Sequence, residues 1–219
     1  MNPLKCALLS GSVFLLAVVG FSFVGNSGVA HAEDGPSGSD EKSQFTYVGS
    51  KSCKKCHSSV EHKTWAKTKM GQAFETLKPG NAKEAKAKHN FDPEKDYTQD
   101  PTCLKCHTTG FGHEGGYFIP DAGDKKAVRK AKKLENVGCE SCHGPGSGYS
   151  KLFKEIQDSK RKYKVEELYA AGLQKITKET CTTCHNEHSP SYDTSAPFDY
   201  EKMKDQDTHE RSEMKQREG

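Results

Sequence analysis

The chain repeats one short pattern, Cys-x-x-Cys-His, four times along its 219 residues. Two cysteines followed directly by a histidine are the attachment signature of c-type haem. In such a site the thiols bond the vinyl groups of the porphyrin, and the histidine binds the iron as its proximal ligand. The sequence therefore predicts four covalently attached haem c groups. The motif residues are Cys53, Cys56 and His57; Cys103, Cys106 and His107; Cys139, Cys142 and His143; and Cys181, Cys184 and His185.

Other uses of paired cysteines explain this pattern less well. Eight cysteines in four pairs would suffice for two zinc sites with four thiolate ligands each. They would also suffice for disulfides in an exported protein or for redox-active Cys-x-x-Cys pairs. Each of these alternatives leaves unexplained why a histidine follows every pair at the same offset.

The first 32 residues have the features of a secretory signal peptide. A positive charge at Lys5 precedes the apolar run 7–24, and Ala30-His31-Ala32 forms a small-residue cleavage pattern. Cleavage there would also remove Cys6, the one cysteine outside the motifs. The alternative is an uncleaved membrane anchor, but glycines and serines dilute the run below the roughly 20 predominantly apolar residues of a spanning helix.

Export would place the mature protein outside the cytoplasmic membrane of a bacterium, in the periplasm or in the extracellular space. Only 32% of the residues are hydrophobic, so a core made of protein alone would be thin. We expect the four macrocycles to supply much of the apolar interior. The predicted fold class is mainly α with long loops and very little strand, the haem-organised fold of a multihaem cytochrome c.

The charge of the chain is nearly balanced, with a formal net charge of +3 at pH 7. This balance gives no indication of nucleic-acid binding. A local basic stretch lies between the second and third motifs, and it is either a solvated helix face or a docking surface for an acidic redox protein. As a docking surface it would act mainly on the rate of association. Its residues are Lys125, Lys126, Arg129, Lys130, Lys132 and Lys133.

Composition divides the mature chain into three segments. Residues 33–44 are rich in glycine, serine and acidic side chains, which predicts a flexible leader. The tetrahaem domain is expected to span residues 45–198. Residues 199–219 form a polar, charged tail, for which a surface helix or a frayed end is expected.

Apolar spacing and turn residues predict helices between the motifs. Pro79-Gly80 would end a helix over 58–78, and Asp124 would cap a helix that runs to about residue 135. A short strand end is expected over 117–119. Further helices are predicted over 81–89, 151–157 and 165–171 and just before the fourth motif.

The ligand on the far side of each iron decides whether that haem is closed and carries electrons or is open to a small molecule. The chain has enough candidates to close every iron. For each histidine the alternative is a surface position or a hydrogen bond to a propionate, and for the methionine it is core filling. The candidates are His62, His89, His113, His188, His209 and Met70.

Residues 47–146 resemble the tetrahaem cytochrome c-554 family. The resemblance is specific over this range, whereas beyond it only the fourth motif and the tail match, and less closely. It is carried by Trp65, by Ala73-Phe74-Glu75-Thr76-Leu77-Lys78-Pro79, by Asp92-Pro93-Glu94-Lys95-Asp96-Tyr97-Thr98-Gln99-Asp100, by Gly110-Phe111-Gly112 and Gly115-Gly116-Tyr117, and by the segment from Val137 to Gly146 around the third motif.

The resemblance implies a mostly helical fold with closely packed haem pairs, and an electron acceptor of hydroxylamine oxidoreductase. It also implies that three haems have two histidine ligands and that the second has only His107. The chain departs from the family at two ligands. Met70 stands where the family has a distal histidine, and residues 144–184 contain no histidine to match another. His209 matches the C-terminal distal ligand of the family.

These observations favour an electron carrier that acts between redox protein partners and performs no chemistry on a substrate. One alternative is a haem enzyme that acts on a small nitrogen oxide or hydroxylamine at an open haem. Another is a subunit of an extracellular cytochrome filament, in which copies self-associate and donate a histidine to a neighbour. Contact with a membrane is expected only if the N-terminal segment stays uncleaved.

Overall fold

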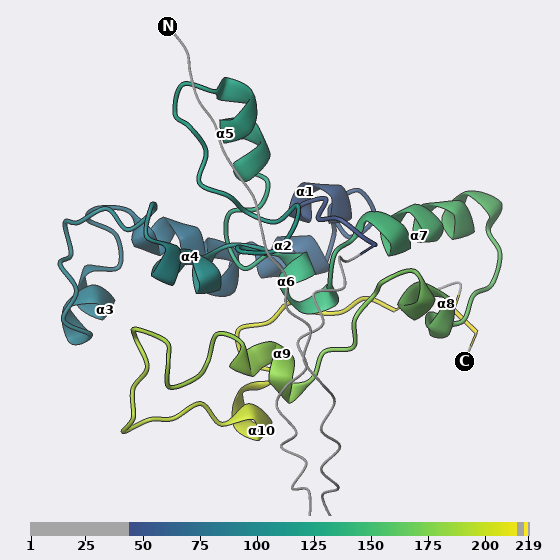
Figure 1. Cartoon of the computed structure of the whole chain (residues 1–219). Coiled ribbons are helices and arrows are strands. Elements are labelled where there is room, and N and C mark those ends of the chain that lie inside the picture. Colours follow the sequence, from purple (N-terminus) through teal and green to yellow (C-terminus); the bar gives the residue numbers. More distant parts are fainter. Residues whose placement is uncertain (1–43, 214–216, 219) are drawn as a thin grey trace, which may run out of the picture. The chain divides into compact units, whose positions relative to one another are not determined.

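Short helices joined by long loops make up the chain in the computed structural model (Figure 1). The structure describes residues 44–213 and 217–218, which all belong to one unit. The predicted signal peptide and nearly all of the predicted leader lie outside the described residues. Within those residues no helix has the length and apolarity needed to cross a bilayer.

The prediction of a mainly helical fold is confirmed. The described residues contain two isolated bridges, Thr108 with Glu135 and Tyr163 with Arg217, but no strand. The helices are α1 (Ser50–Cys53), α2 (Glu61–Trp65), the 3₁₀ helix η1 (Met70–Leu77), α3 (Lys83–Lys88), α4 (Pro101–His107), α5 (Lys125–Ala131), α6 (Cys139–His143), α7 (Ser147–Ser159), α8 (Val165–Ala170), α9 (Lys178–Thr182) and α10 (Tyr200–Met203).

The expected continuous helix over 58–78 is wrong, because the chain breaks between α2 and η1. A side chain at Gly71 would place its Cβ 2.2 Å from the Trp65 carbonyl oxygen, so the backbone turns back tightly here. The Thr68 hydroxyl stabilises this turn by donating to the Trp65 carbonyl at 2.7 Å and accepting from the Gly71 amide at 2.9 Å. As predicted, the helical conformation ends just before Pro79.

The other predicted helices are found in place, with different lengths. Asp124 caps α5 as predicted, accepting from the amides of Lys126 at 2.8 Å and Ala127 at 3.0 Å. Helix α5 ends at Ala131 rather than near residue 135, and α7 begins earlier than predicted. The strand end expected over 117–119 is wrong, since Tyr117 makes one loop hydrogen bond to Thr109 and packs its ring on Phe74.

The apolar core of the described residues consists of two small clusters. One contains Phe74 and Leu77 of η1 with Leu104 of α4, together with Tyr97, Tyr117, Ala131 and Leu134. The other contains Ile156, Tyr163 and Leu168, where α7 packs on α8. Clusters of this size agree with the expectation of a thin protein-only core.

A buried glutamate in the third motif joins two distant segments. The Glu140 side chain accepts three backbone amides, from Val48 at 2.9 Å, Gly49 at 2.6 Å and Gly146 at 2.6 Å. Burial raises the pKa of this carboxyl, although the three amide bonds act in the opposite direction. Because Gly49 immediately precedes α1, Glu140 fixes the start of the first motif against α6.

The polar tail is neither one long helix nor frayed over its described part. After α10 it runs along α2 as a segment that we call the C-terminal strap, residues 207–212. The Asp207 carboxylate accepts the Lys69 amide at 3.0 and 3.2 Å, and the Glu210 amide donates to the Thr64 hydroxyl at 3.0 Å. The Ser212 amide donates to the Glu61 carboxylate at 2.8 Å. Hydrogen bonds from three strap residues to α2 and to the loop after it therefore position the strap.

Candidate haem-attachment sites

Each Cys-x-x-Cys-His motif forms one helical turn. The whole motif lies inside α4 for the second and inside α6 for the third. In the first and fourth, the histidine amide bonds the carbonyl of the first cysteine, at 3.0 Å for His57 and 3.0 Å for His185. Positions i, i+3 and i+4 share a face of a helical turn, so the two cysteines and the histidine of each motif face the same way. This geometry fits a covalently bound haem.

The motifs contact one another in an order different from their order in the chain. The Cys53 and Cys139 side chains interact, which raises the pKa of Cys53 and lowers that of Cys139, and α1 packs on α6. An interaction between the Cys106 and Cys184 side chains joins the second motif to the fourth. Helix α6 also packs on α9. The contacts therefore run from the first motif to the third, then to the fourth and the second.

His107 of the second motif is held by the main chain of η1. Its Nδ1 lies 2.7 Å from the Ala73 carbonyl oxygen and 3.2 Å from the Thr76 hydroxyl. Burial lowers the pKa of His107. With Nδ1–H donating to the carbonyl, the other nitrogen, Nε2, is left as the metal-binding atom. Such a partner orients a metal-bound imidazole in the way that haem requires.

His57 of the first motif has a carboxylate as its neighbour. Its Nδ1 lies 3.6 Å from Glu61 Oε2, and its ring stacks on Phe153 at 6.0 Å between centres. Burial would raise the pKa of Glu61, but hydrogen bonds from the Ser212 hydroxyl and amide, together with the charge of His57, lower it to about 2. The carboxylate is therefore ionised at neutral pH.

His143 of the third motif faces His209 of the strap. The two ring centres are 6.1 Å apart, with an angle of 33° between the ring planes. Because a metal–imidazole bond is about 2 Å long, two imidazoles on opposite sides of one metal have centres roughly 6 Å apart. Burial, with the nearby charges of His209 and His57, lowers the pKa of His143 to about 4, which keeps the ring neutral. The spacing of the pair fits an iron between them.

His185 of the fourth motif stacks on an aromatic ring. The Phe198 ring lies 4.6 Å from it between centres, with the planes 17° apart. His185 is nevertheless exposed. Phe198 comes from the loop before α10, so a segment outside the motif orients this histidine.

Among the contacts of the described residues, the side chains of the other predicted distal ligands do not meet the ring of a motif histidine, although the His62 amide donates to the His57 carbonyl at 2.9 Å. Met70 is half-buried at the start of η1, where its carbonyl accepts the Val137 amide at 3.1 Å. His62 contacts Trp65 edge-to-face at 5.3 Å, and His89 is half-buried at the end of α3. The remaining two, His113 and His188, are exposed.

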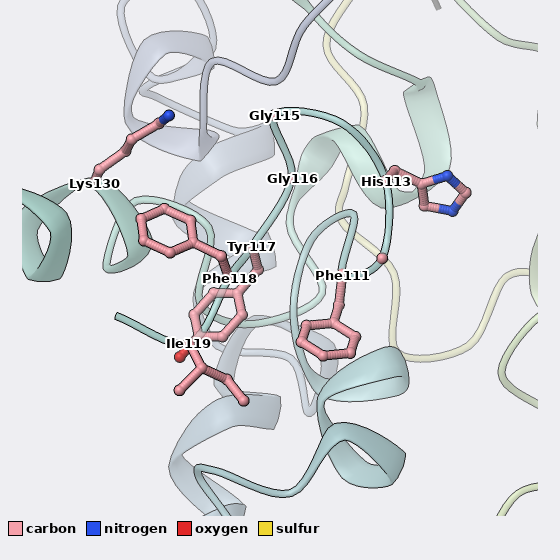
Figure 2. A pocket seen from close by; sticks show the side chains of 9 residues that line it. Phe111, His113, Gly115, Gly116, Tyr117, Phe118, Ile119 and Lys130 are labelled. Atoms are coloured by element: carbon pink, nitrogen blue, oxygen red, sulfur yellow. The ribbon is translucent and has the colours of Figure 1, made fainter. Parts of the chain in front are cut away.

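A hollow of about 470 Å³ opens beside the loop that follows the second motif (Figure 2). The rings of Phe111, Tyr117 and Phe118 line it, and His113 points away from them (Figure 2). Lys130 of α5 lies at its rim with Nζ 5.6 Å from the centre of the Phe118 ring. The hollow is thus bordered by the basic stretch between the second and third motifs.

The arrangement does not favour the zinc or disulfide alternatives. None of the eight motif cysteines is paired in a disulfide. Within the described ranges, no three or more histidine, cysteine or acidic side chains converge as metal ligands.

Several residues that support the motifs were not singled out in the sequence. Glu61 and Phe198 act on histidines from other segments, and Glu140 acts on the backbone before α1. Glu61 stands four residues after His57, one helical turn away, which is a signal that the sequence does contain. Phe198 and Glu140 act across long sequence separations, so no local spacing marks them.

Comparisons with known proteins agree with this geometry. The family model described as cytochrome c554 and c-prime matches residues 52–144. Cytochrome c-554 of Nitrosomonas europaea is 34% identical over 201 residues, covering 89% of this chain and 74% of the relative. The solved structure of the reduced state of cytochrome c554 from Nitrosomonas europaea aligns with a TM-score of 0.67 at 34% identity, over 80% of this chain and 90% of that one. The chain therefore belongs to the cytochrome c-554 family and is a c-type cytochrome that carries electrons on covalently bound haem.

Proposed function

We propose that the chain is an exported carrier with four haem c groups, which passes electrons between two redox proteins. The observation that carries this proposal is the continuous series of contacts from the first motif through the third and fourth to the second. When bound, each haem supplies the one-electron chemistry of its iron. The chain's own contribution is to attach, space and orient these groups.

The motif side chains would hold the haems. The eight motif cysteines would form the thioether links, and His57, His107, His143 and His185 would be the proximal ligands. We assign His209 as the second ligand of the third haem, supported by its 6.1 Å separation from His143. For the other haems, Met70, His62, His89, His113 and His188 stay candidates, and the family resemblance supports an open second haem with His107 alone.

The ligand assignment has a direct test. Intact mass and iron analysis should give four haems per chain, and His209→Ala should turn one iron high-spin in the electron paramagnetic resonance spectrum of the oxidised protein. An unchanged spectrum would remove His209 from the ligand set. Met70→Ala, measured in the same way, decides whether Met70 closes another iron.

Small-ligand binding separates the carrier from an enzyme that acts on a nitrogen oxide or hydroxylamine. If all four irons are low-spin and the reduced protein takes up no carbon monoxide, the enzyme alternative fails. Uptake at one site would support the open second haem instead. A filament subunit is tested by size-exclusion chromatography, because a monomer that persists at high concentration argues against self-association.

The end of the series at the second motif is proposed as a docking surface for an acidic redox protein. There α5 presents its lysines and arginine beside the aromatic hollow, and Ile119 and Val128 are 38% and 36% exposed. An apolar centre with a charged rim is the usual composition of a protein interface. The basic rim would steer a partner of opposite charge.

An anionic oxidant can probe this surface without the natural partner. In stopped-flow oxidation by ferricyanide, Lys126→Glu with Arg129→Glu should slow the reaction about tenfold at low salt, and the difference should vanish at high salt. The matched control is Lys151→Glu with Lys162→Glu, an equal change of charge at other exposed sites. Equal slowing by both pairs would mean that α5 has no special role.

A further inference from the structure

The two carboxylate oxygens of Glu61 contact two different segments, the first motif and the C-terminal strap. Oε2 lies 3.6 Å from Nδ1 of His57, the proximal histidine of the first motif. Oε1 accepts the Ser212 amide at 2.8 Å and also the Ser212 hydroxyl. Only 14% of the Glu61 side chain is exposed, so water competes weakly for these contacts.

The strap that Glu61 holds is the segment that carries His209. Asp207 is fastened on one side of His209, and Glu210 and Ser212 are fastened on the other. The His209 ring is oriented as well, because its Nδ1 lies 2.7 Å from the Glu210 carbonyl oxygen. The hydrogen bonds on both sides of His209 thus hold its ring near His143, with 6.1 Å between the ring centres.

We propose that Glu61 is a positioning residue shared by the first and third haems. One oxygen increases the strength with which the His57 imidazole donates electrons to the first iron. The other oxygen binds Ser212 and so holds the strap that brings His209 to the third iron. The inference rests on the proposed assignment of His209. It goes beyond that assignment because it links two metal centres through one side chain that binds neither.

The two roles have separable consequences. A carboxylate that faces Nδ1–H makes the imidazole a stronger donor and favours the oxidised iron, which lowers the reduction potential. This effect needs the negative charge. Holding the strap needs only an oxygen that accepts hydrogen bonds, and the amide of glutamine also has one.

Three variants distinguish these roles in the haem-loaded protein. Glu61→Gln should change the oxidised-to-reduced ratio of one haem about tenfold toward the reduced form, a shift of about 59 mV, with no new high-spin iron. Ser212→Ala should leave that potential unchanged but give partial high-spin signal from the third haem. Glu61→Ala should do both. Glu75→Gln, an equal loss of charge at an exposed site paired with Lys78, should do neither.

Spectroelectrochemistry measures the potentials, and electron paramagnetic resonance measures the spin states. Unchanged potentials in Glu61→Gln would overturn the role at His57. A fully low-spin Glu61→Ala protein would overturn the role at the strap, provided that His209→Ala does produce a high-spin iron. If His209→Ala is itself silent, the ligand assignment fails, and the potential shift in Glu61→Gln then reports on the first haem alone.

Discussion

The second and fourth motifs share one five-residue pattern but differ in what surrounds them. In the second motif, Leu104 is fully buried in the larger apolar cluster. The loop after that motif is tied down by long-range bonds, such as Thr109 amide to Leu134 carbonyl at 2.8 Å. In the fourth, Thr182 occupies the position equivalent to Leu104 and is half-buried. Asn186 supplies local bonds there, to the carbonyls of Thr182 at 2.8 Å and Thr183 at 3.0 Å.

This difference separates two ways of supporting a haem. Protein packing supports the second motif, because Leu104 fills a position in the larger apolar cluster. The fourth motif contributes no residue to either apolar cluster of the described residues, so its haem would supply a larger share of the apolar contacts that stabilise it. We therefore expect changes of equal size to have unequal effects at the two sites.

The largest expected effect is at the two equivalent motif positions. Leu104→Ala should lower the free energy of unfolding by about 2–5 kcal/mol, because it leaves a cavity in a filled core. Thr182→Ala should change it by less than about 1 kcal/mol. Denaturant unfolding of the haem-loaded proteins measures both values. Equal losses would mean that the motifs are equally supported.

Hydrogen exchange should show the same contrast without mutation. Amides in residues 103–109 are expected to exchange on the order of tenfold more slowly than those in residues 178–185, because long-range bonds and burial protect the former. Mass spectrometry of the peptides gives this ratio. Similar protection in both segments would indicate that haem alone orders each motif.

The smallest expected effect concerns how each proximal histidine is oriented. Phe198→Ala should remove a stack worth about 0.5–1.5 kcal/mol and change the paramagnetic resonance signal of one haem, since the His185 ring can then rotate. Thr76→Val should leave the second haem's signal nearly unchanged, because the Ala73 carbonyl still holds His107 at 2.7 Å. A larger spectral change in Thr76→Val would reverse the proposed contrast.

The predictable features are those that local spacing encodes. The Cys-x-x-Cys-His turns, the Asp124 cap and the end of η1 before Pro79 each depend on residues within a few positions of one another. The break before η1 is not encoded in local spacing, because it depends on how closely Gly71 approaches the Trp65 backbone. The pairing of motifs depends on contacts such as Cys106 with Cys184, which are remote in sequence. The sequence makes His209 one of six ligand candidates and the family resemblance favours it, whereas its position near His143 depends on hydrogen bonds to α2 and to the loop after it.

The order in which the motifs contact one another would arrange the proposed haems as a single linear path for electrons. The third and fourth motifs lie in the middle of this path, joined where α6 packs on α9. The first and second motifs lie at its two ends. Loss of a haem from the first or second motif would remove an end of this series, whereas loss of one from the third or fourth would interrupt it. The first and second motifs are neighbours in the sequence. An electron that moves from the haem of the first to that of the second would nevertheless pass through the haems of the third and fourth.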